Sequence, residues 1–178
     1  MLAYKGFNSN LTCTMGKGTF QYEQGVKYTE ENAHCGADGF HATDDPLGVL
    51  SYYNKSDDRY FLVELGGNID EDGVNSRISA PEITLMRELS KTEMYMRGLI
   101  WMSRHPKAKM ASVVREETGD AAGSGYVIVR GKHPKARGKK ASKKGKPGLI
   151  SKPATRKINM NTALLSIPTV RPTYISSR

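Results

Sequence analysis

The charges of this 178-residue chain fall into two parts of opposite sign, which limits where a folded core can form. All 18 acidic residues precede Ala121, whereas residues 121–178 contain 14 of the 27 lysines and arginines. With 13 basic and 18 acidic residues, the first 120 residues carry a net charge of −5, and the last 58 carry +14. A block of one sign is typical of a solvated interaction segment that is attracted to nucleic acid or to an acidic protein surface.

The last part of the chain differs in composition from a folded domain. From Gly131 to about Pro153 it is rich in Lys, Gly, Pro and Ser, and it offers too little apolar surface to fold alone. Apolar residues return after that, interrupted by prolines, which indicates an arm that docks on a partner. We therefore predict a compact domain at residues 1–130 and an extended basic arm at 131–178.

The basic residues around the start of this arm are the candidates for binding a partner or nucleic acid. Contacts of such residues with nucleic acid would reach phosphates, so they would be sensitive to salt and independent of sequence. The arm has too few aromatic residues to stack on bases. The candidates are Arg130, Lys132, Lys135, Arg137, Lys139, Lys140, Lys143, Lys144 and Lys146.

Residues 39–53 read as a short strand, a tight turn and a short helix. Asp45 is a good N-cap, and Pro46 suits the first helical position, where its missing N–H costs nothing. His41 and Thr43 occupy alternate strand positions and therefore point to the same face. A polar pair on one face of a strand, just before a helix, is a candidate site.

Several further strands are predicted on either side of this stretch. Residues 2–7 read as a first strand, and residues 19–29 as a hairpin that turns at Gln24-Gly25. Residues 59–65 are apolar on nearly both faces, which places this strand in the middle of a sheet. Residues 76–87 form another strand, in which a proline marks an edge or a break.

One longer helix is predicted at residues 90–104. The pattern Ser90-Lys-Thr-Glu93 is a capping box, and apolar residues follow at helical spacing. Residues 107–124 have a weak helical or short-repeat character, and residues 126–130 form a last strand. The expected fold class is α+β, with a compact mixed β-sheet core and two main helices.

The two cysteines and the hydropathy indicate the redox state of the thiols and whether the protein binds a membrane or is secreted. Cys13 and Cys35 form no disulfide framework and no metal-binding cluster, so we expect free thiols, a bridge between them being the alternative, and no bound metal. No apolar run is long enough to cross a membrane, and the first residues lack the apolar stretch of a signal peptide. We therefore expect neither membrane association nor secretion.

Several motifs in order resemble an uncharacterised domain family that is common in phage genomes. They are Tyr4-Lys-Gly-Phe7, Phe20-Gln-Tyr-Glu23 with Gly25 and Tyr28, Gly39-Phe-His41, and Pro46-Leu-x-Val-Leu-x-Tyr-Tyr53. The resemblance covers roughly residues 3–135 and implies a phage protein found in the virion or the host cytoplasm. The family implies no activity, and it does not account for the Lys-rich arm.

A more distant resemblance is to ADP-ribosyltransferases, which bind NAD. Tyr4-Lys5-Gly6, Gly39-Phe-His41-Ala, Ser-Tyr-Tyr53 and the strand from Tyr60 follow the order of their NAD site. The resemblance implies that Tyr4, Gly6, His41 and Tyr53 bind the cofactor. It also implies a catalytic carboxylate that stabilises the oxocarbenium-like transition state, for which Glu88 and Glu82 are the candidates. Lys5 stands where the family has His or Arg, and the chain has no Glu-x-Glu motif.

Each of these residues also has a structural interpretation. His41 is either a substrate-binding or acid–base group or a buried structural histidine, and the tyrosines are either stacking residues or core aromatics. We expect a non-enzymatic, virion- or capsid-associated protein without a cofactor, which contacts other proteins of a multi-subunit assembly. The arm would dock on an acidic protein surface or on nucleic-acid phosphates. The alternatives are an ADP-ribosyltransferase-like enzyme that modifies a host macromolecule and a host-defence inhibitor.

Overall fold

The chain forms two compact units, Met1–Val113 and Val114–Arg178. The computed structural model describes residues 1–14, 18–73, 76–121 and 126–138, together with the backbone of 156–158 and 162–166.

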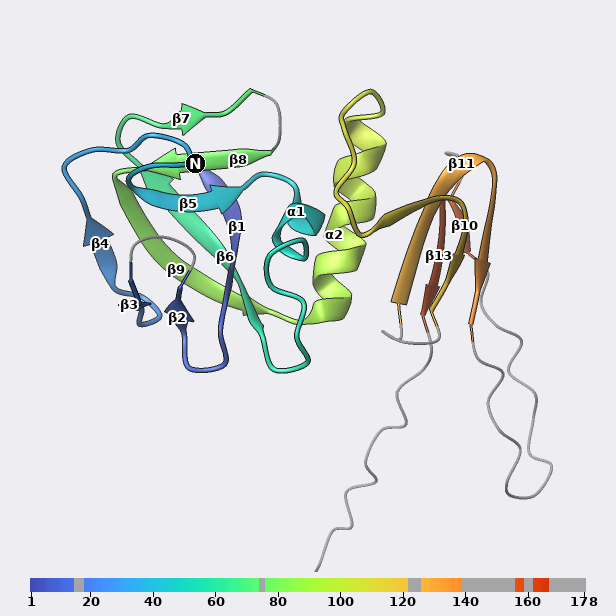
Figure 1. Ribbon diagram of the computed structural model, residues 1–178, viewed down its shortest axis with the longest axis horizontal. Coiled ribbons are helices and arrows are strands. Elements are labelled where there is room, and N and C mark those ends of the chain that lie inside the picture. Colours follow the sequence, from blue (N-terminus) through green and yellow to red (C-terminus); the bar gives the residue numbers. More distant parts are fainter. Residues whose placement is uncertain (15–17, 74–75, 122–125, 139–155, 159–161, 167–178) are drawn as a thin grey trace, which may run out of the picture. The chain divides into compact units, whose positions relative to one another are not determined.

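The first unit is built on a seven-stranded antiparallel sheet (Figure 1). The strand order is β4-β9-β6-β1-β5-β8-β7, so that β6 has two strands on one side and four on the other. The two-sided apolar pattern of β6 thus correctly predicted an interior strand. The strands are β1 (Leu2–Phe7), β4 (Lys27–Thr29), β5 (Phe40–Thr43), β6 (Arg59–Gly66), β7 (Asp70–Glu71), β8 (Arg77–Ala80) and β9 (Glu82–Leu89).

The predicted hairpin at residues 19–29 is wrong. β3 (Phe20–Gln21) pairs with β2 (Thr12–Cys13), whereas β4 pairs with the distant strand β9. Gly25 does turn the chain, with a positive φ of 81°, but its N–H donates to the Leu85 carbonyl 2.9 Å away. The backbone groups of residues 25 and 27–29 therefore pair with the edge of β9 and not with one another in a local hairpin.

The two helices of the described residues begin where the sequence predicts. The Asp45 carboxylate caps α1 (Pro46–Val49) by accepting from the Leu47 N–H at 2.9 Å. The Ser90 hydroxyl caps α2 (Lys91–Arg104) by accepting from the N–H of Glu93 at 3.2 Å. Pro81 separates β8 from β9, which confirms the break predicted in residues 76–87.

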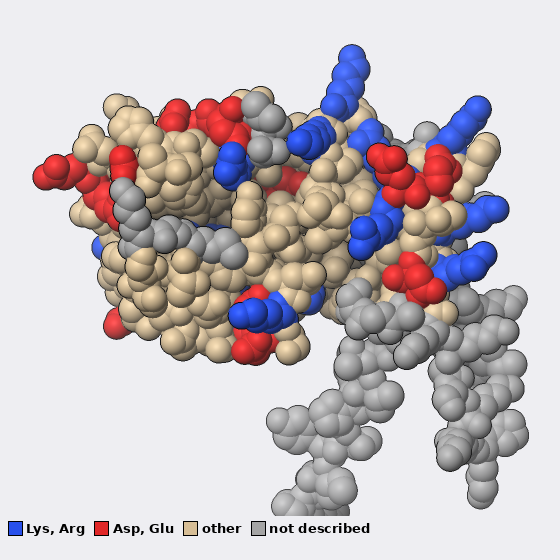
Figure 2. All heavy atoms as spheres, in the orientation of Figure 1, with Lys and Arg blue, Asp and Glu red and all other residues tan. Residues whose placement is uncertain are grey.

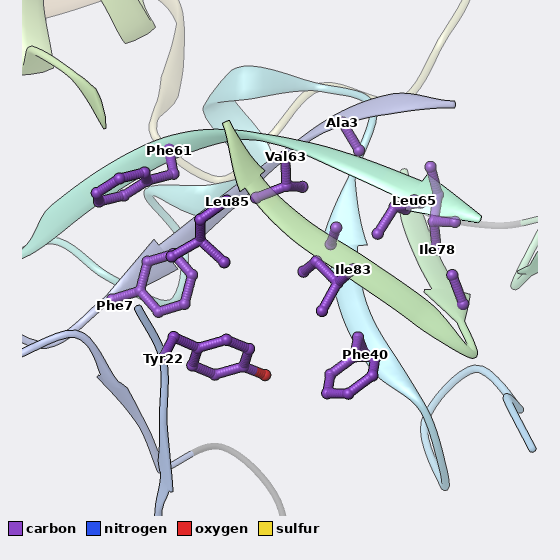
Figure 3. Close-up of a cluster of buried hydrophobic side chains, with 12 residues drawn as sticks. Ala3, Phe7, Tyr22, Phe40, Phe61, Val63, Leu65, Ile78, Ile83 and Leu85 are labelled. Carbon is purple, nitrogen blue, oxygen red and sulfur yellow. The ribbon is translucent and has the colours of Figure 1, made fainter. Parts of the chain in front are cut away.

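An aromatic and aliphatic cluster covers one face of this sheet (Figure 3). The ring of Phe7 meets those of Tyr22 and Phe61 edge-on, with centroids 5.1 and 5.6 Å apart. These buried rings join strands that are far apart in the sequence, and such aromatic pairs stabilise a fold beyond the area that they bury. The cluster consists of Ala3, Phe7, Tyr22, Phe40, Ala42, Phe61, Val63, Leu65, Ile78, Ala80, Ile83 and Leu85.

The second unit is a four-stranded sheet with the order β10-β11-β13-β12. β10 runs parallel to β11, and β13 runs antiparallel to both β11 and β12. A small cluster of Ala121, Val127 and Val129 is buried in it. The strands are β10 (Val114–Asp120), β11 (Tyr126–Arg137), β12 (Arg156–Ile158) and β13 (Thr162–Ser166).

Two features of this unit differ from the sequence-based expectation. Residues 114–120 form a strand rather than a helical or repeat segment, because their backbone pairs with β11. The strand predicted at 126–130 continues to Arg137, so the domain boundary placed at residue 130 falls inside β11. Most of the predicted arm lies outside the described residues.

Candidate functional site

A cavity of about 530 Å³ opens in the first unit, between β1, β5, the end of α1 and the loops before them. Four side chains or backbone positions that the sequence singles out line it together: Tyr4, Gly6, His41 and Tyr53. Two exposed aromatic residues, Phe20 and Tyr52, also line it. The volume is that of a small-molecule site.

Gly6 and Tyr53 lie against each other in this cavity. A Cβ atom at Gly6 would lie 2.6 Å from the Tyr53 ring and 2.7 Å from Val49. The close approach that a glycine permits here is therefore already taken by Tyr53, which is 7% exposed. The Tyr53 hydroxyl donates to the Cys13 sulfur at 3.1 Å, and burial raises the pKa of this tyrosine. Cys13 and Cys35 are both free thiols, as expected.

His41 holds the loop that precedes it. Its Nε2 accepts a hydrogen bond from the Gly36 N–H at 2.8 Å, so this nitrogen carries no proton. Burial, and then the nearby Lys5 ammonium, lower the pKa of His41, which keeps the ring neutral near pH 7. The same loop is fixed by the Gly39 N–H, which donates to Glu30 at 3.1 Å.

Lys5 is a further polar residue of the cavity, for which the sequence alone predicts no role. It is 6% exposed, and its ammonium donates to the His41 carbonyl at 2.5 Å. Burial lowers its pKa below the usual 10.5, and Cys13 and Glu30 offset part of this effect. The burial of Lys5 could be predicted from the alternation of side chains along β1. Lys5 lies on the same face of this strand as two core residues, Ala3 and Phe7.

The two predicted catalytic carboxylates do not line the cavity. Glu88 makes two hydrogen bonds with Arg59, at 2.8 and 2.7 Å, and this contact lowers the pKa of the carboxyl. Glu82 pairs with Lys27 at 2.9 Å. The carboxylates among the lining residues are instead Glu30 and Asp38.

Four of the nine basic candidates lie on β11. Lys132, Lys135 and Arg137 are exposed and Arg130 is half-buried, whereas Lys139, Lys140, Lys143, Lys144 and Lys146 lie outside the described residues. β10 places acidic residues beside them in register, Glu116 opposite Arg130 and Asp120 opposite Arg137. Figure 2 shows acidic and basic side chains side by side over these two strands.

A bulge in this strand pair is closed by Glu117. Its carboxylate accepts from the backbone N–H groups of Lys132 and His133, at 2.8 and 3.3 Å. Glu117 itself has a φ of +55°, which is uncommon for a residue with a side chain. The fold thus brings acidic residues from before Ala121 onto the same sheet as the first basic residues after it.

Two further findings concern the described residues alone. No group of three or more His, Cys, Asp or Glu side chains there is arranged to hold a metal ion. Neither of their helices combines the length and the apolar character that crossing a membrane requires.

The first 97 residues match a family model described as "Domain of unknown function (DUF7666)". The match covers more than half of the chain, and the chain belongs to this family. No curated protein matches the sequence. The matched residues include every residue that lines the cavity, whereas β10 to β13 lie beyond them. The cavity therefore lies within the matched domain, and the second unit lies beyond the matched residues.

Proposed function

We propose that this protein is a non-enzymatic, phage-encoded component of a larger assembly, associated with the virion or capsid. Its arm docks on nucleic-acid phosphates or on an acidic surface of a neighbouring protein. The distribution of charge carries this proposal: no acidic residue follows Asp120, and exposed Lys132, Lys135 and Arg137 lead into five more lysines up to Lys146.

The contacts of the predicted catalytic residues support a non-enzymatic role. Glu88 and Glu82 are engaged in ion pairs away from the cavity. The Tyr53 ring fills the space beside Gly6, and the Nε2 lone pair of His41 already accepts a hydrogen bond from the Gly36 N–H. Each residue thus has a structural partner that accounts for its type.

Binding of the full chain to a mixed-sequence DNA duplex, measured by fluorescence anisotropy at several salt concentrations, tests the phosphate contacts. The test variant carries Gln at Lys139, Lys140 and Lys143. Each lost phosphate contact lowers the slope of log K against log salt by about 0.9, so this variant loses up to about 3 from its slope.

A matched control separates a specific segment from net charge alone. Gln at Lys55, Lys107 and Lys109 removes the same three charges from exposed positions in the first unit. The proposal expects the control to bind like the unmodified chain. An equal decrease of the slope in both variants would show that only net charge matters. A slope near zero for the unmodified chain would exclude phosphate contacts.

A second candidate is an ADP-ribosyltransferase-like enzyme, favoured by one observation. Tyr4, Gly6, His41 and Tyr53, which the resemblance assigns to NAD, come from three segments (β1, β5 and the residues after α1) and line one cavity. NAD would have to displace the Tyr53 ring from Gly6, and the nearest acids would be Glu30 and Asp38 rather than the residues of β9.

Calorimetric titration of NAD into the full chain decides this second candidate. Binding that His41→Ala or Tyr53→Ala removes, and that Glu88→Gln leaves unchanged, would favour the enzyme. Glu88→Gln is the matched control because Glu88 lies outside the cavity lining. No heat of binding at millimolar NAD would exclude NAD as a ligand of the cavity and would contradict this second candidate.

A further inference from the structure

The buried amine of Lys5 is an unusual feature of the cavity. Lysine is almost never fully buried unless it is paired with an acid. Here Lys5 lines a cavity of about 530 Å³, and among the described residues its ammonium group makes a single hydrogen bond, to the carbonyl oxygen of His41. Its Nζ lies 5.8 and 5.7 Å from the ring centroids of Phe7 and Tyr22.

The groups that face Lys5 come from four segments. Cys13 on β2 and Glu30 after β4 favour its charged form, whereas His41 on β5 is held neutral and Tyr22 after β3 is a buried phenol. The desolvation of the amine is the larger effect, and it lowers the pKa of Lys5. A desolvated lysine in an apolar pocket is a common way to obtain a neutral, nucleophilic amine.

We propose that Lys5 is a carbonyl-binding nucleophile, whose amine forms an imine with a small aldehyde or ketone that carries an apolar or aromatic group. The geometry supports this in two ways. Lys5 lines an open cavity, with its Nζ 5.7 Å from the ring of Tyr22, and Phe20, Tyr22 and Phe40 in the same lining provide an apolar wall for the rest of the ligand. The inference is independent of the proposed assembly role.

The step balances without any further reagent. The lone pair of Lys5 Nζ attacks the carbonyl carbon and forms the new C–N bond, while the π pair of the carbonyl moves to its oxygen. Both protons of the neutral amine then transfer to that oxygen, which leaves as water, and the nitrogen lone pair forms the C=N bond. The His41 carbonyl holds one N–H of the resting amine and thereby orients Nζ before the attack.

Reductive trapping on the full chain tests this inference. The protein is incubated with benzaldehyde and sodium cyanoborohydride near pH 7, and benzylated lysines are located by peptide mass spectrometry. Each unit by which a pKa lies below that of another lysine gives about ten times more neutral amine at this pH. We therefore expect more label on Lys5 than on Lys55 or Lys107, although these two are exposed and Lys5 is buried.

The pH profile provides a second readout that a merely structural lysine would not produce. Because burial lowers the pKa of Lys5, its labelling should level off at a lower pH than that of a fully solvated amine. Labelling of Lys5 at or below the level of the exposed lysines would overturn the inference. This comparison uses the unmodified protein, so it does not depend on the folding of a variant.

Variants assign the labelled atom. Lys5→Arg keeps a buried cation but lacks a nucleophilic amine, and it should lose the label at this position without a change in circular dichroism. Cys13→Ser tests whether the neighbouring thiol takes part. A thiol also adds to an aldehyde, but cyanoborohydride does not reduce that adduct. Label that persists in Cys13→Ser is expected, whereas label that disappears with Cys13 would contradict direct attack by Lys5.

Discussion

The Asp45 carboxyl gives the most quantitative prediction, because burial raises its pKa from the usual 3.8 to about 6. Asp45 is 2% exposed and caps α1, the helix that carries Val49 and precedes Tyr53 in the cavity. Between pH 3.8 and 6 the folded protein holds a proton that the unfolded chain has lost. Stability therefore falls as pH rises through this window, by about 1.4 kcal/mol per unit and about 3 kcal/mol in all.

Asp45→Asn should remove this cost. The amide oxygen can still accept from the Leu47 N–H, and Asn and Asp are about equal as N-caps. We expect the variant to be more stable by up to about 3 kcal/mol near pH 7, and to differ by only a few tenths of a kcal/mol near pH 4.

Urea unfolding measured by tryptophan fluorescence checks this prediction. The single tryptophan, Trp101, lies on α2 and donates to Asp44 at 3.3 Å, so it reports on the first unit. Because both proteins share every other titrating group, the difference between them isolates position 45. A difference that does not change between pH 4 and 7, or a variant less stable at pH 7, would refute the reasoning.

Three further predictions concern packing and ion pairs. Gly6→Ala should lower the urea midpoint through a cost of about 1 to 3 kcal/mol, because its Cβ would meet the Tyr53 ring at 2.6 Å; an unchanged midpoint would contradict this packing. Glu88→Gln breaks only an exposed ion pair, so it should cost less than about 1 kcal/mol and leave labelling of the cavity lysine unaltered. Glu117→Ala should speed hydrogen exchange of the amides of 132–133, which lose their carboxylate acceptor, and equal exchange rates would refute that contact.

The elements that the sequence predicted well are those with strong local signals. The N-caps at Ser90 and Asp45 position two helices through hydrogen bonds within three residues, although the Glu93 carboxylate of the predicted capping box pairs with Arg87 and Arg97 instead. The two apolar faces of β6 predict an interior strand whatever its neighbours are.

The elements that the sequence did not predict depend on distant partners. β4 pairs with β9, and β10 is a strand because β11 lies beside it, although its own residues show no regular apolar pattern. No window of local sequence contains these pairings. The edge of a sheet has unpaired backbone N–H and C=O groups, and the segment that pairs with them is determined by the rest of the fold.

The candidate site shows the same division. Tyr4, Gly6, His41 and Tyr53 line one cavity, and their binding of a cofactor stays a prediction. The order of residues in the chain predicts Glu82 and Glu88 on β9 as the acids, but both form cross-strand ion pairs, with Lys27 and Arg59, outside the cavity lining. The alternation of side chains along β1 predicts that Lys5 is buried. The cavity beside it cannot be predicted in this way, because its lining residues come from segments far apart in the sequence.

Incorporation into assembled particles tests the central proposal most directly. Gln at Lys139, Lys140, Lys143, Lys144 and Lys146 removes five charges from the arm without touching a described strand. The unmodified chain and the Lys55, Lys107 and Lys109→Gln control should sediment with the particles, whereas the five-lysine variant should remain free in solution. Equal incorporation of all three proteins would contradict docking through the arm.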